Sequence, residues 1–180
     1  MIQIRETKTD HYNLDLSRVA IGGCSAGGHL SAVIAHVCRD AGVPLVLQIL
    51  SVPAVDLHVF DPDGAIRVDQ PYASYRELAE TQPLPLERIK WCYEQFLGSP
   101  RPKHLENDWK VSPILAPNFE GLAPALIITA DMDILRDEGE SYAARMEQAG
   151  CDVKLVRFKG ATHTFMQLDG MFIVSSPRLI

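Results

Sequence analysis

The sequence of 180 residues lacks a hydrophobic run long enough to cross a membrane, and it lacks a dense cluster of basic residues. A transmembrane helix needs about 20 consecutive apolar residues, and no apolar run here approaches that length. The net charge is −6 at pH 7, and the lysines and arginines are scattered along the chain. Proteins that bind nucleic acids or anionic membranes usually carry basic patches. The sequence therefore indicates a protein without a membrane span whose main partner is not a nucleic acid.

The sequence also has little that would hold a metal ion or direct the chain to secretion. Its four cysteines are far apart, with no C-x-x-C pair and no cysteine–histidine spacing suited to zinc. The first 18 residues (MIQIRETKTDHYNLDLSR) are polar and lack the hydrophobic segment of a signal peptide. We therefore expect a cytoplasmic protein with free thiols and no bound metal.

What the sequence does have is an ordinary globular composition, with 47% hydrophobic and 22% charged residues. Four short apolar runs are expected to form strands, at 18–22, 45–50, 125–130 and 153–158. A helix ending near Gly42 separates the first two strands, and a helix over 137–148 separates the last two. Strand–helix–strand units of this kind imply an α/β fold with a mostly parallel sheet flanked by helices.

The middle of the chain, at about 54–121, breaks this pattern. Nine prolines lie from Pro53 to Pro117, and turn signals such as DPDG at 61–64 recur. Only the segment 86–97 (LERIKWCYEQFL) has apolar residues at helical spacing. We predict one domain over residues 1–180, with an irregular insertion of the kind that forms a lid or wall over a pocket.

A glycine-rich stretch, GGCSAGGHL at 22–30, stands between the first strand and the first helix. Its Gly23, Ser25 and Gly27 fit the motif G-x-S-x-G in the strand–turn–helix context that the motif requires. Such a turn strains the serine backbone, and glycines two residues either side avoid collisions with the neighbouring strand or helix. The turn lifts the hydroxyl above the sheet edge, beside helix N–H groups that favour negative charge. We therefore predict that Ser25 is a nucleophile.

Two alternatives remain open for this stretch. Cys24 is intrinsically more reactive than Ser25, although its own flanking residues, Gly22 and Ala26, supply only one glycine. Glycine-rich turns also open helices that bind phosphate groups. The residues that follow decide between these interpretations.

An acidic residue follows the third expected strand, and a histidine follows the last. The order serine, acid, histidine is that of the α/β-hydrolases and differs from the order in other serine hydrolases. We predict that Asp133 is the acid and that His163 is the general base, with Asp131 as the alternative acid. In such a triad the histidine takes the serine proton, and the carboxylate orients the imidazole.

Three segments together resemble the hormone-sensitive-lipase-like carboxylesterases, over about residues 16–168. GGCSAGGHLSA resembles the G-D-S-A-G-G signature of that family, and ADMDILRDEGESYAARMEQAG resembles its acid-bearing segment. KGATHTF resembles its histidine segment. The resemblance implies an α/β-hydrolase fold, a small-molecule ester as substrate and no cofactor. It also implies a triad of Ser25, Asp133 and His163 that works through an acyl-enzyme, with the N–H of Ala26 in the oxyanion hole.

The sequence departs from this family in two ways. Cys24 stands where the family has an aspartate, and the chain contains no H-G-G-G loop, which supplies the other oxyanion donors in the family. The resemblance therefore implies a partial α/β-hydrolase domain that lacks the first strands of the fold. Strand 18–22 would then be an edge strand with unpaired backbone groups, so we expect self-association through that edge. Loss of an oxyanion donor typically lowers the rate by about 10²–10³, so we also expect impaired activity.

The function predicted from the sequence is that of a serine hydrolase, a carboxylesterase or lipase that cleaves carboxylic esters. One alternative is a non-catalytic ligand-binding protein or an inactive truncated homologue, as in the plant gibberellin receptors, which resemble the same family. A further alternative is a lyase or dehydratase on the same scaffold. The presence of His163 speaks against the binding protein, and the missing oxyanion loop speaks for it.

Overall fold

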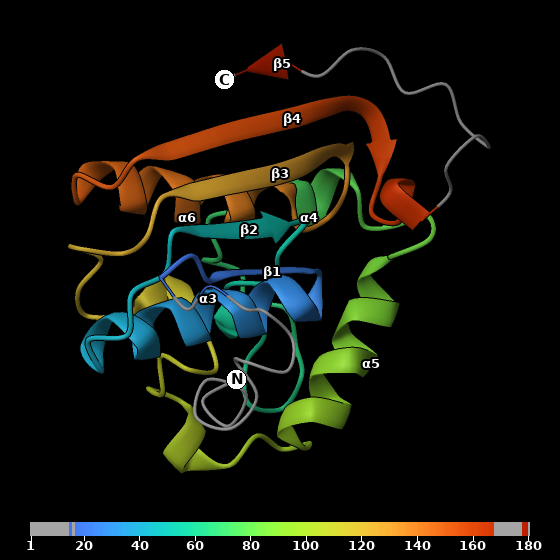
Figure 1. The fold of residues 1–180 in the computed structure, drawn as a ribbon. Coiled ribbons are helices and arrows are strands. Elements are labelled where there is room, and N and C mark those ends of the chain that lie inside the picture. Colours follow the sequence, from blue (N-terminus) through green and yellow to red (C-terminus); the bar gives the residue numbers. More distant parts are fainter. Residues whose placement is uncertain (1–14, 16, 168–177, 180) are drawn as a thin grey trace.

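The apolar runs of the sequence assemble into one sheet (Figure 1). The computed structural model describes residues 15, 17–167 and 178–179. The strands are β1 (Ala20–Cys24), β2 (Leu47–Ser51), β3 (Ala125–Met132), β4 (Val153–Thr162) and β5 (Arg178–Leu179). They lie in the order β1-β2-β3-β4-β5; the first four are parallel, and β5 pairs antiparallel with β4. The predicted α/β class and its parallel sheet are confirmed.

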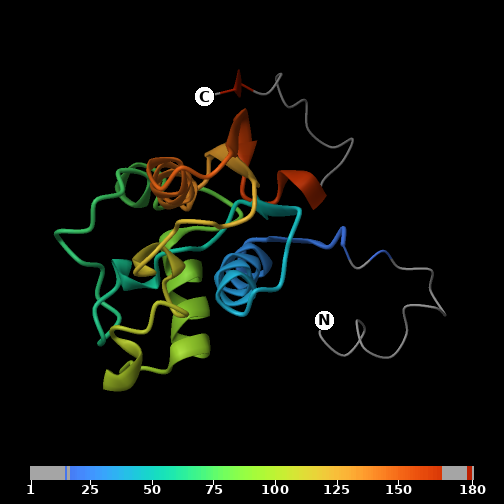
Figure 2. The same ribbon diagram turned by 60° about the vertical axis from the view of Figure 1, so that its left-hand side comes forward.

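Two helices provide the crossovers between these strands. Helix α3 (Ala26–Asp40) connects β1 to β2, and α6 (Arg136–Gln148) connects β3 to β4. Both lie on the same side of the sheet, as Figure 2 shows. Each helix is followed by a glycine with positive φ, 64° at Gly42 and 80° at Gly150, a conformation that glycine adopts without strain. The predicted helices are therefore confirmed, with ends that differ by one or two residues.

Helix α3 turns an unexpected face to the sheet. The apolar spacing of Leu30, Val33, Ile34, Val37 and Cys38 predicts the helix. Of these, Leu30, Ile34 and Val37 have exposed fractions of 56%, 38% and 44%, Val33 is half-buried, and only Cys38 is buried. The buried side carries small residues instead, among them Ala32 and Ala35. Small side chains let the helix axis approach the strands closely, and the larger apolar side chains then point outward.

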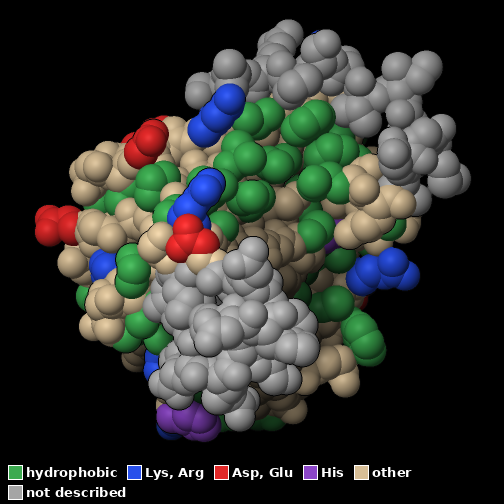
Figure 3. Space-filling view, viewed as in Figure 1, with side chains coloured by type: hydrophobic (Ala, Val, Ile, Leu, Met, Phe, Trp, Pro, Cys, Tyr) green, Lys and Arg blue, Asp and Glu red, His purple; other side chains and the backbone are tan. Residues whose placement is uncertain are grey.

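The side chains of the sheet alternate between its two faces, as expected for strands. Leu50 and Ile127, on the helix side, are fully buried, whereas Leu126 and Ile128, on the other side, are half-buried. Figure 3 shows hydrophobic side chains gathered over the strands in the upper half of the view. In the described part of the chain, β1 pairs with β2 alone and is an edge strand. Self-association through this edge stays a prediction.

The insertion at 54–121 consists of short helical pieces joined by turns. They are η1 (Leu57–Val59), α4 (Ser74–Glu77), α5 (Leu86–Leu97), η2 (Lys103–Leu105) and η3 (Pro113–Leu115). Helix α5 has the predicted bounds, and it buries Ile89, Tyr93 and Leu97 at intervals of four residues. Among the described residues, no helix combines the length and the apolar character that a membrane span requires.

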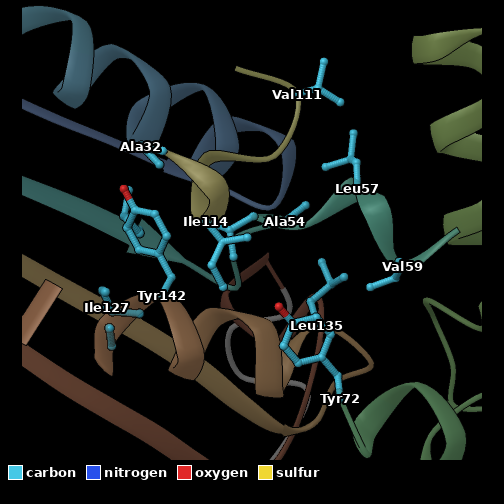
Figure 4. Close-up of a cluster of buried hydrophobic side chains, with 14 of the residues drawn as sticks. Ala32, Ala54, Leu57, Val59, Tyr72, Val111, Ile114, Ile127, Leu135 and Tyr142 are labelled. Carbon is cyan, nitrogen blue, oxygen red and sulfur yellow. The ribbon is translucent and has the colours of Figure 1, made fainter. Parts of the chain in front are cut away.

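The insertion shares a hydrophobic core with the two crossover helices (Figure 4). Leu57 and Ile114 of the insertion contribute to the same buried cluster as Ala32 of α3 and Tyr142 of α6. Helix α6 contributes Tyr142, Ala143 and Met146 to this core, and each is at most 1% exposed. This shared core places the insertion directly over the side of the sheet that carries the helices.

Two strands extend further than predicted. The sequence places a loop at 131–133 and another at 160–163, but β3 continues to Met132 and β4 to Thr162. The register of the β3–β4 pair shifts between Ala130 and Met132, and pairing resumes after the shift with Met132 opposite Thr162. Gly160, with φ 72°, therefore lies within β4 rather than in a loop after it. These extensions bring both strand ends close to the turn after β1.

Candidate active site

Ser25 forms the single-residue turn between β1 and α3. Its backbone has φ 56° and ψ −119°, a region that residues other than glycine rarely adopt. The N–H of Ser25 donates to the carbonyl of Ser51 (2.8 Å), and the carbonyl of Ser25 accepts from the N–H of His29 (3.0 Å). The strained turn predicted from the sequence is therefore present, and it is held by hydrogen bonds on both sides.

The glycines around Ser25 have different reasons for being glycine. A Cβ atom at Gly23 would lie 2.3 Å from the backbone of Gly27, which is sterically impossible. A Cβ at Gly27 would meet nothing within 4 Å, so the predicted collision does not exist there. The second crowded position is Gly28, where a Cβ would lie 2.9 Å from Pro53. The sequence could not identify Gly28, because Pro53, which follows β2, is 25 residues away in the chain.

The three predicted triad residues come together at the carboxyl ends of parallel strands. Ser25 follows β1, Asp133 follows β3 and His163 follows β4. The hydroxyl of Ser25 lies 2.9 Å from Nε2 of His163, and Nδ1 of His163 lies 2.9 Å from Oδ2 of Asp133. Ser25 and His163, which are 138 positions apart in sequence, therefore belong with Asp133 to one continuous series of hydrogen bonds.

The surroundings of Asp133 and His163 fix the direction of these hydrogen bonds. Asp133 is 1% exposed, and its other oxygen, Oδ1, accepts the N–H of Leu135 (3.1 Å). A carboxylate can only accept, so it holds the proton of the imidazole on Nδ1. Nε2 is then free to accept the hydroxyl proton of Ser25. This arrangement can transfer a proton from a serine to a histidine.

The alternative residues have other partners. Cys24 packs against the buried cluster of Val52, Ala130 and Ala161, and its sulfur accepts a long hydrogen bond (3.6 Å) from the amide of Gln167. The carboxylate of Asp131 accepts the N–H of Gly160 (3.2 Å). The geometry therefore directs His163 to Ser25 rather than Cys24, and to Asp133 rather than Asp131.

Ala26, the predicted oxyanion donor, is the first residue of α3. The first N–H groups of an α-helix have no acceptor within the helix, and the helix dipole places partial positive charge there. The first turn of α3 carries no acidic side chain that would compensate this charge. The N-terminus of α3 can therefore stabilise an anion that forms beside Ser25.

An apolar cavity of about 280 Å³ adjoins Ser25. Its walls come from α3, from the segment after β2 and from the insertion, and besides Ser25 they comprise Ala26, His29, Leu30, Ala54, Leu57, Leu84, Ile89, Cys92, Tyr93 and Phe96. Tyr93 of α5 packs in the core and also lines this cavity. Trp91 is 60% exposed and is not part of the wall.

His29, which lines this cavity, joins α3 to two segments of the insertion, a role the sequence did not indicate. Its Nδ1 lies 3.0 Å from the carbonyl oxygen of Ala54, and its Nε2 lies 3.0 Å from that of Lys110. Burial lowers the pKa of His29, although the two carbonyls act in the opposite direction. The side chain thus connects α3 to the insertion at Ala54 and at Lys110.

The rest of the described structure offers less for chemistry. A larger cavity of about 440 Å³ lies in the insertion, but its lining includes charged side chains of both signs and none of the three triad residues. Within residues 15, 17–167 and 178–179, no group of three or more His, Cys, Asp or Glu side chains is placed to hold a metal ion.

Comparisons with known proteins agree with the α/β fold. Residues 1–167 match a family model described as alpha/beta hydrolase fold. The carboxylic ester hydrolase LipN of Mycobacterium tuberculosis is 36% identical over 169 residues, which cover 91% of this chain and 41% of LipN. The ethyl acetate hydrolase of Pseudomonas putida is 31% identical over 161 residues, which cover 88% of this chain and 46% of that enzyme.

A solved structure is also similar. The thermostable carboxylesterase EstE1, cloned from a metagenomic library, superposes with a TM-score of 0.79 at 34% identity, over 95% of this chain and 54% of EstE1. The chain thus spans less than half the length of LipN and of the ethyl acetate hydrolase.

Proposed function

The chain belongs to the alpha/beta hydrolase family, and we propose that it carries the catalytic triad of a serine hydrolase that cleaves carboxylic esters. The observation that carries this proposal is the hydrogen-bonded chain from Ser25 through His163 to Asp133. The names of the relatives, which are ester hydrolases, support the same reaction class.

The proposed reaction has two halves. The oxygen of Ser25 attacks the ester carbonyl carbon while Nε2 of His163 takes the hydroxyl proton. The tetrahedral intermediate then collapses, the C–O bond to the alcohol breaks, and His163 returns the proton to the leaving alcohol. Water, activated in the same way by His163, next hydrolyses the acyl-serine. Throughout, Asp133 orients the imidazole and stabilises its charged form.

The oxyanion of the tetrahedral intermediate would lie at the N-terminus of α3, where the N–H of Ala26 donates to it. A serine esterase normally supplies further donors, and each missing donor costs about 10²–10³ in rate. We therefore expect this chain to form the acyl-enzyme slowly. A strongly activated phosphonate leaves a covalent adduct after a single reaction, so it detects a reactive Ser25 even where turnover is slow.

The cavity beside Ser25 favours an uncharged ester with a small or medium apolar group. Its walls are formed mainly by aliphatic and aromatic side chains, and among the residues that line it none is acidic or a lysine or arginine. An apolar group gains free energy by leaving water for such a wall, whereas a charged group would lose its hydration without a partner.

The proposal is tested with a fluorophosphonate probe, which reacts covalently with activated serines. We expect mass spectrometry to locate the adduct on Ser25, and we expect Ser25→Ala and His163→Ala to abolish labelling. Cys24→Ala is the matched control next to the nucleophile, and it should still be labelled. Absence of labelling in the folded wild-type chain would contradict the proposal and would favour a ligand-binding protein.

A further inference from the structure

A fully buried carboxyl group lies close to the triad but takes no part in the proposed reaction. Glu138 is 0% exposed, in the first turn of α6 and five residues after Asp133. Burial of a carboxyl group is costly unless its oxygens accept hydrogen bonds, so a group of this kind needs a structural or functional reason.

All three hydrogen-bond donors to Glu138 come from the insertion. Its Oε1 accepts the N–H groups of Val55 (2.7 Å) and Asp56 (3.3 Å), and its Oε2 accepts the hydroxyl of Tyr75 (2.7 Å). Burial and the nearby Asp56 raise the pKa of Glu138, and the hydrogen bonds oppose this effect. Glu138 thus joins a crossover helix to two separate parts of the insertion.

Both of these parts lead to the cavity beside Ser25. Val55 directly follows Ala54, which lines the cavity and whose carbonyl contacts the ring of His29. Tyr75 packs edge-to-face on Phe60 with ring centroids 6.3 Å apart. Phe60 packs in turn edge-to-face on Tyr93, which also lines the cavity, at 5.5 Å.

The segment 133–138 also makes two hydrogen bonds to Ser74, the first residue of α4. The carboxylate of Asp137 accepts the N–H of Ser74 (2.7 Å), and the carbonyl of Ile134 accepts the hydroxyl of Ser74 (2.7 Å). Residues 133–138 therefore hold His163 at one end, through Asp133, and the insertion at the other.

We propose that Glu138 is a positioning residue that sets the place of the cavity walls relative to Ser25, and hence the binding of the ester's apolar group. This inference rests on the proposed function. The triad itself depends on the strand ends and on Asp133, so loss of Glu138 leaves it assembled. Loss of Glu138 should therefore weaken substrate binding more than it slows the chemical step.

The test compares Glu138→Leu, which removes every acceptor, with Glu138→Gln, which keeps one oxygen for the N–H groups of Val55 and Asp56. Glu147→Gln, which removes an exposed carboxylate from the same helix, is the matched control. For each variant, kcat and KM are measured with p-nitrophenyl esters, and amide hydrogen exchange is measured for the segment 53–57 and for β3.

We expect Glu138→Leu to raise KM about tenfold or more, because losing a hydrogen bond to a buried carboxylate typically changes an equilibrium constant by about a factor of ten or more. The same variant should change kcat by less than about threefold, because the proposed triad stays assembled. Exchange in 53–57 should accelerate about tenfold or more, while β3 stays protected. Glu138→Gln should restore most of the binding, and Glu147→Gln should match the wild type. Unchanged KM and unchanged exchange in 53–57 for Glu138→Leu would overturn the proposal.

A second variant covers the case in which Glu138→Leu does not fold. Tyr75→Phe removes one donor and leaves Glu138 in place, and we expect it to raise KM by about threefold to tenfold and to accelerate exchange in 53–57. If Tyr75→Phe leaves both unchanged, the proposal is wrong. Hydrogen exchange needs no catalysis, so it distinguishes a failed anchor from a failure of the proposed function, in which Ser25 would not react with the phosphonate.

Discussion

The triad and the insertion that walls its cavity are built in opposite ways. Ser25, Asp133 and His163 stand directly after strands, and backbone hydrogen bonds of a parallel sheet set the distances between them. The insertion at 54–121 has one helix of more than four residues, and many of its anchors are buried polar side chains. We therefore expect the proposed triad to tolerate changes in the insertion, whereas the proposed selection of substrate should depend on them.

The anchors of the insertion illustrate this contrast. Arg101, 8% exposed, donates to the carbonyls of Leu57 and Phe60. Ser112, 0% exposed, accepts the N–H of Leu57 (2.8 Å). Irregular backbone leaves N–H and C=O groups without neighbouring strands, so side chains must satisfy them. Glu138 and Ser74 belong to this set as well, and both link the insertion to the turn that carries Asp133.

The largest expected effect lies on the strand-end side of the comparison. We predict that Ser25→Ala lowers kcat for a p-nitrophenyl ester by about 10⁴-fold or more, because the nucleophile is lost. The melting temperature should not fall, since Ser25 has a strained backbone and makes its side-chain contact only with His163. Steady-state kinetics and thermal unfolding check both parts, and a variant with wild-type kcat would refute the first.

A pair of glycine substitutions tests how tightly the strand-end turn is packed. Gly23→Ala places a Cβ atom 2.3 Å from the backbone of Gly27 and should lower the free energy of unfolding by more than about 3 kcal/mol. Gly27→Ala meets open space and should change it by less than about 1 kcal/mol. Urea unfolding measures both, and equal effects would show that the turn is not packed as described.

Acid pH should lower the free energy of unfolding through His36, which lies where α3 packs against the insertion. Burial lowers the pKa of His36 to about 4, and its ring packs on Trp109, Phe119 and Tyr142. A lowered histidine pKa means that the unfolded chain takes up the proton first. The neutral ring therefore makes its full contribution to the free energy of unfolding above pH 6.5. This contribution falls by about 3 kcal/mol as the pH drops toward 4.

The pH effect is measured as the free energy of unfolding between pH 7 and pH 4. We expect His36→Phe to flatten the profile in this range. His104→Phe, which changes an exposed histidine of the same insertion, should leave the slope as in the wild type. Parallel slopes for all three proteins would contradict the assignment of the effect to His36.

The smallest expected effect concerns the size of the cavity. Cys92 lines its wall from α5, and Cys92→Phe should fill part of the volume of about 280 Å³. We predict that the ratio of kcat/KM for a hexanoate ester to kcat/KM for an acetate ester falls about tenfold. A tenfold change corresponds to about 1.4 kcal/mol, which is the apolar burial that the longer acyl group would lose. Trp91→Phe, at an exposed neighbouring position, is the control and should leave this ratio unchanged.

The two regions also differ in how far the sequence predicts them. The strands around the site, helix α5 and the meeting of Ser25, Asp133 and His163 were predictable, because apolar runs and the motif order report local backbone structure directly. The bounds of β3 and β4 were not, since a register irregularity near Ala130 lets pairing continue past residues that read as a loop.

Side-chain environment was harder to predict than secondary structure. The outward face of α3 was not foreseeable, because an apolar stripe indicates a helix but not which side the sheet takes. His29 contacts a residue 25 positions away in sequence, and Glu138 contacts one 83 positions away. Neither residue belongs to a local sequence pattern, so neither role could be predicted. The steric role assigned to Gly27 belongs to Gly28 for the same reason.

The most direct test is a crystal structure of the chain after reaction with a p-nitrophenyl alkyl phosphonate. The account predicts phosphorus bonded to Oγ of Ser25, a phosphoryl oxygen within hydrogen-bond distance of the N–H of Ala26, and the alkyl group between α3 and α5. An adduct on Cys24, or an alkyl group that lies outside the cavity walled by Ala54 and Tyr93, would contradict it.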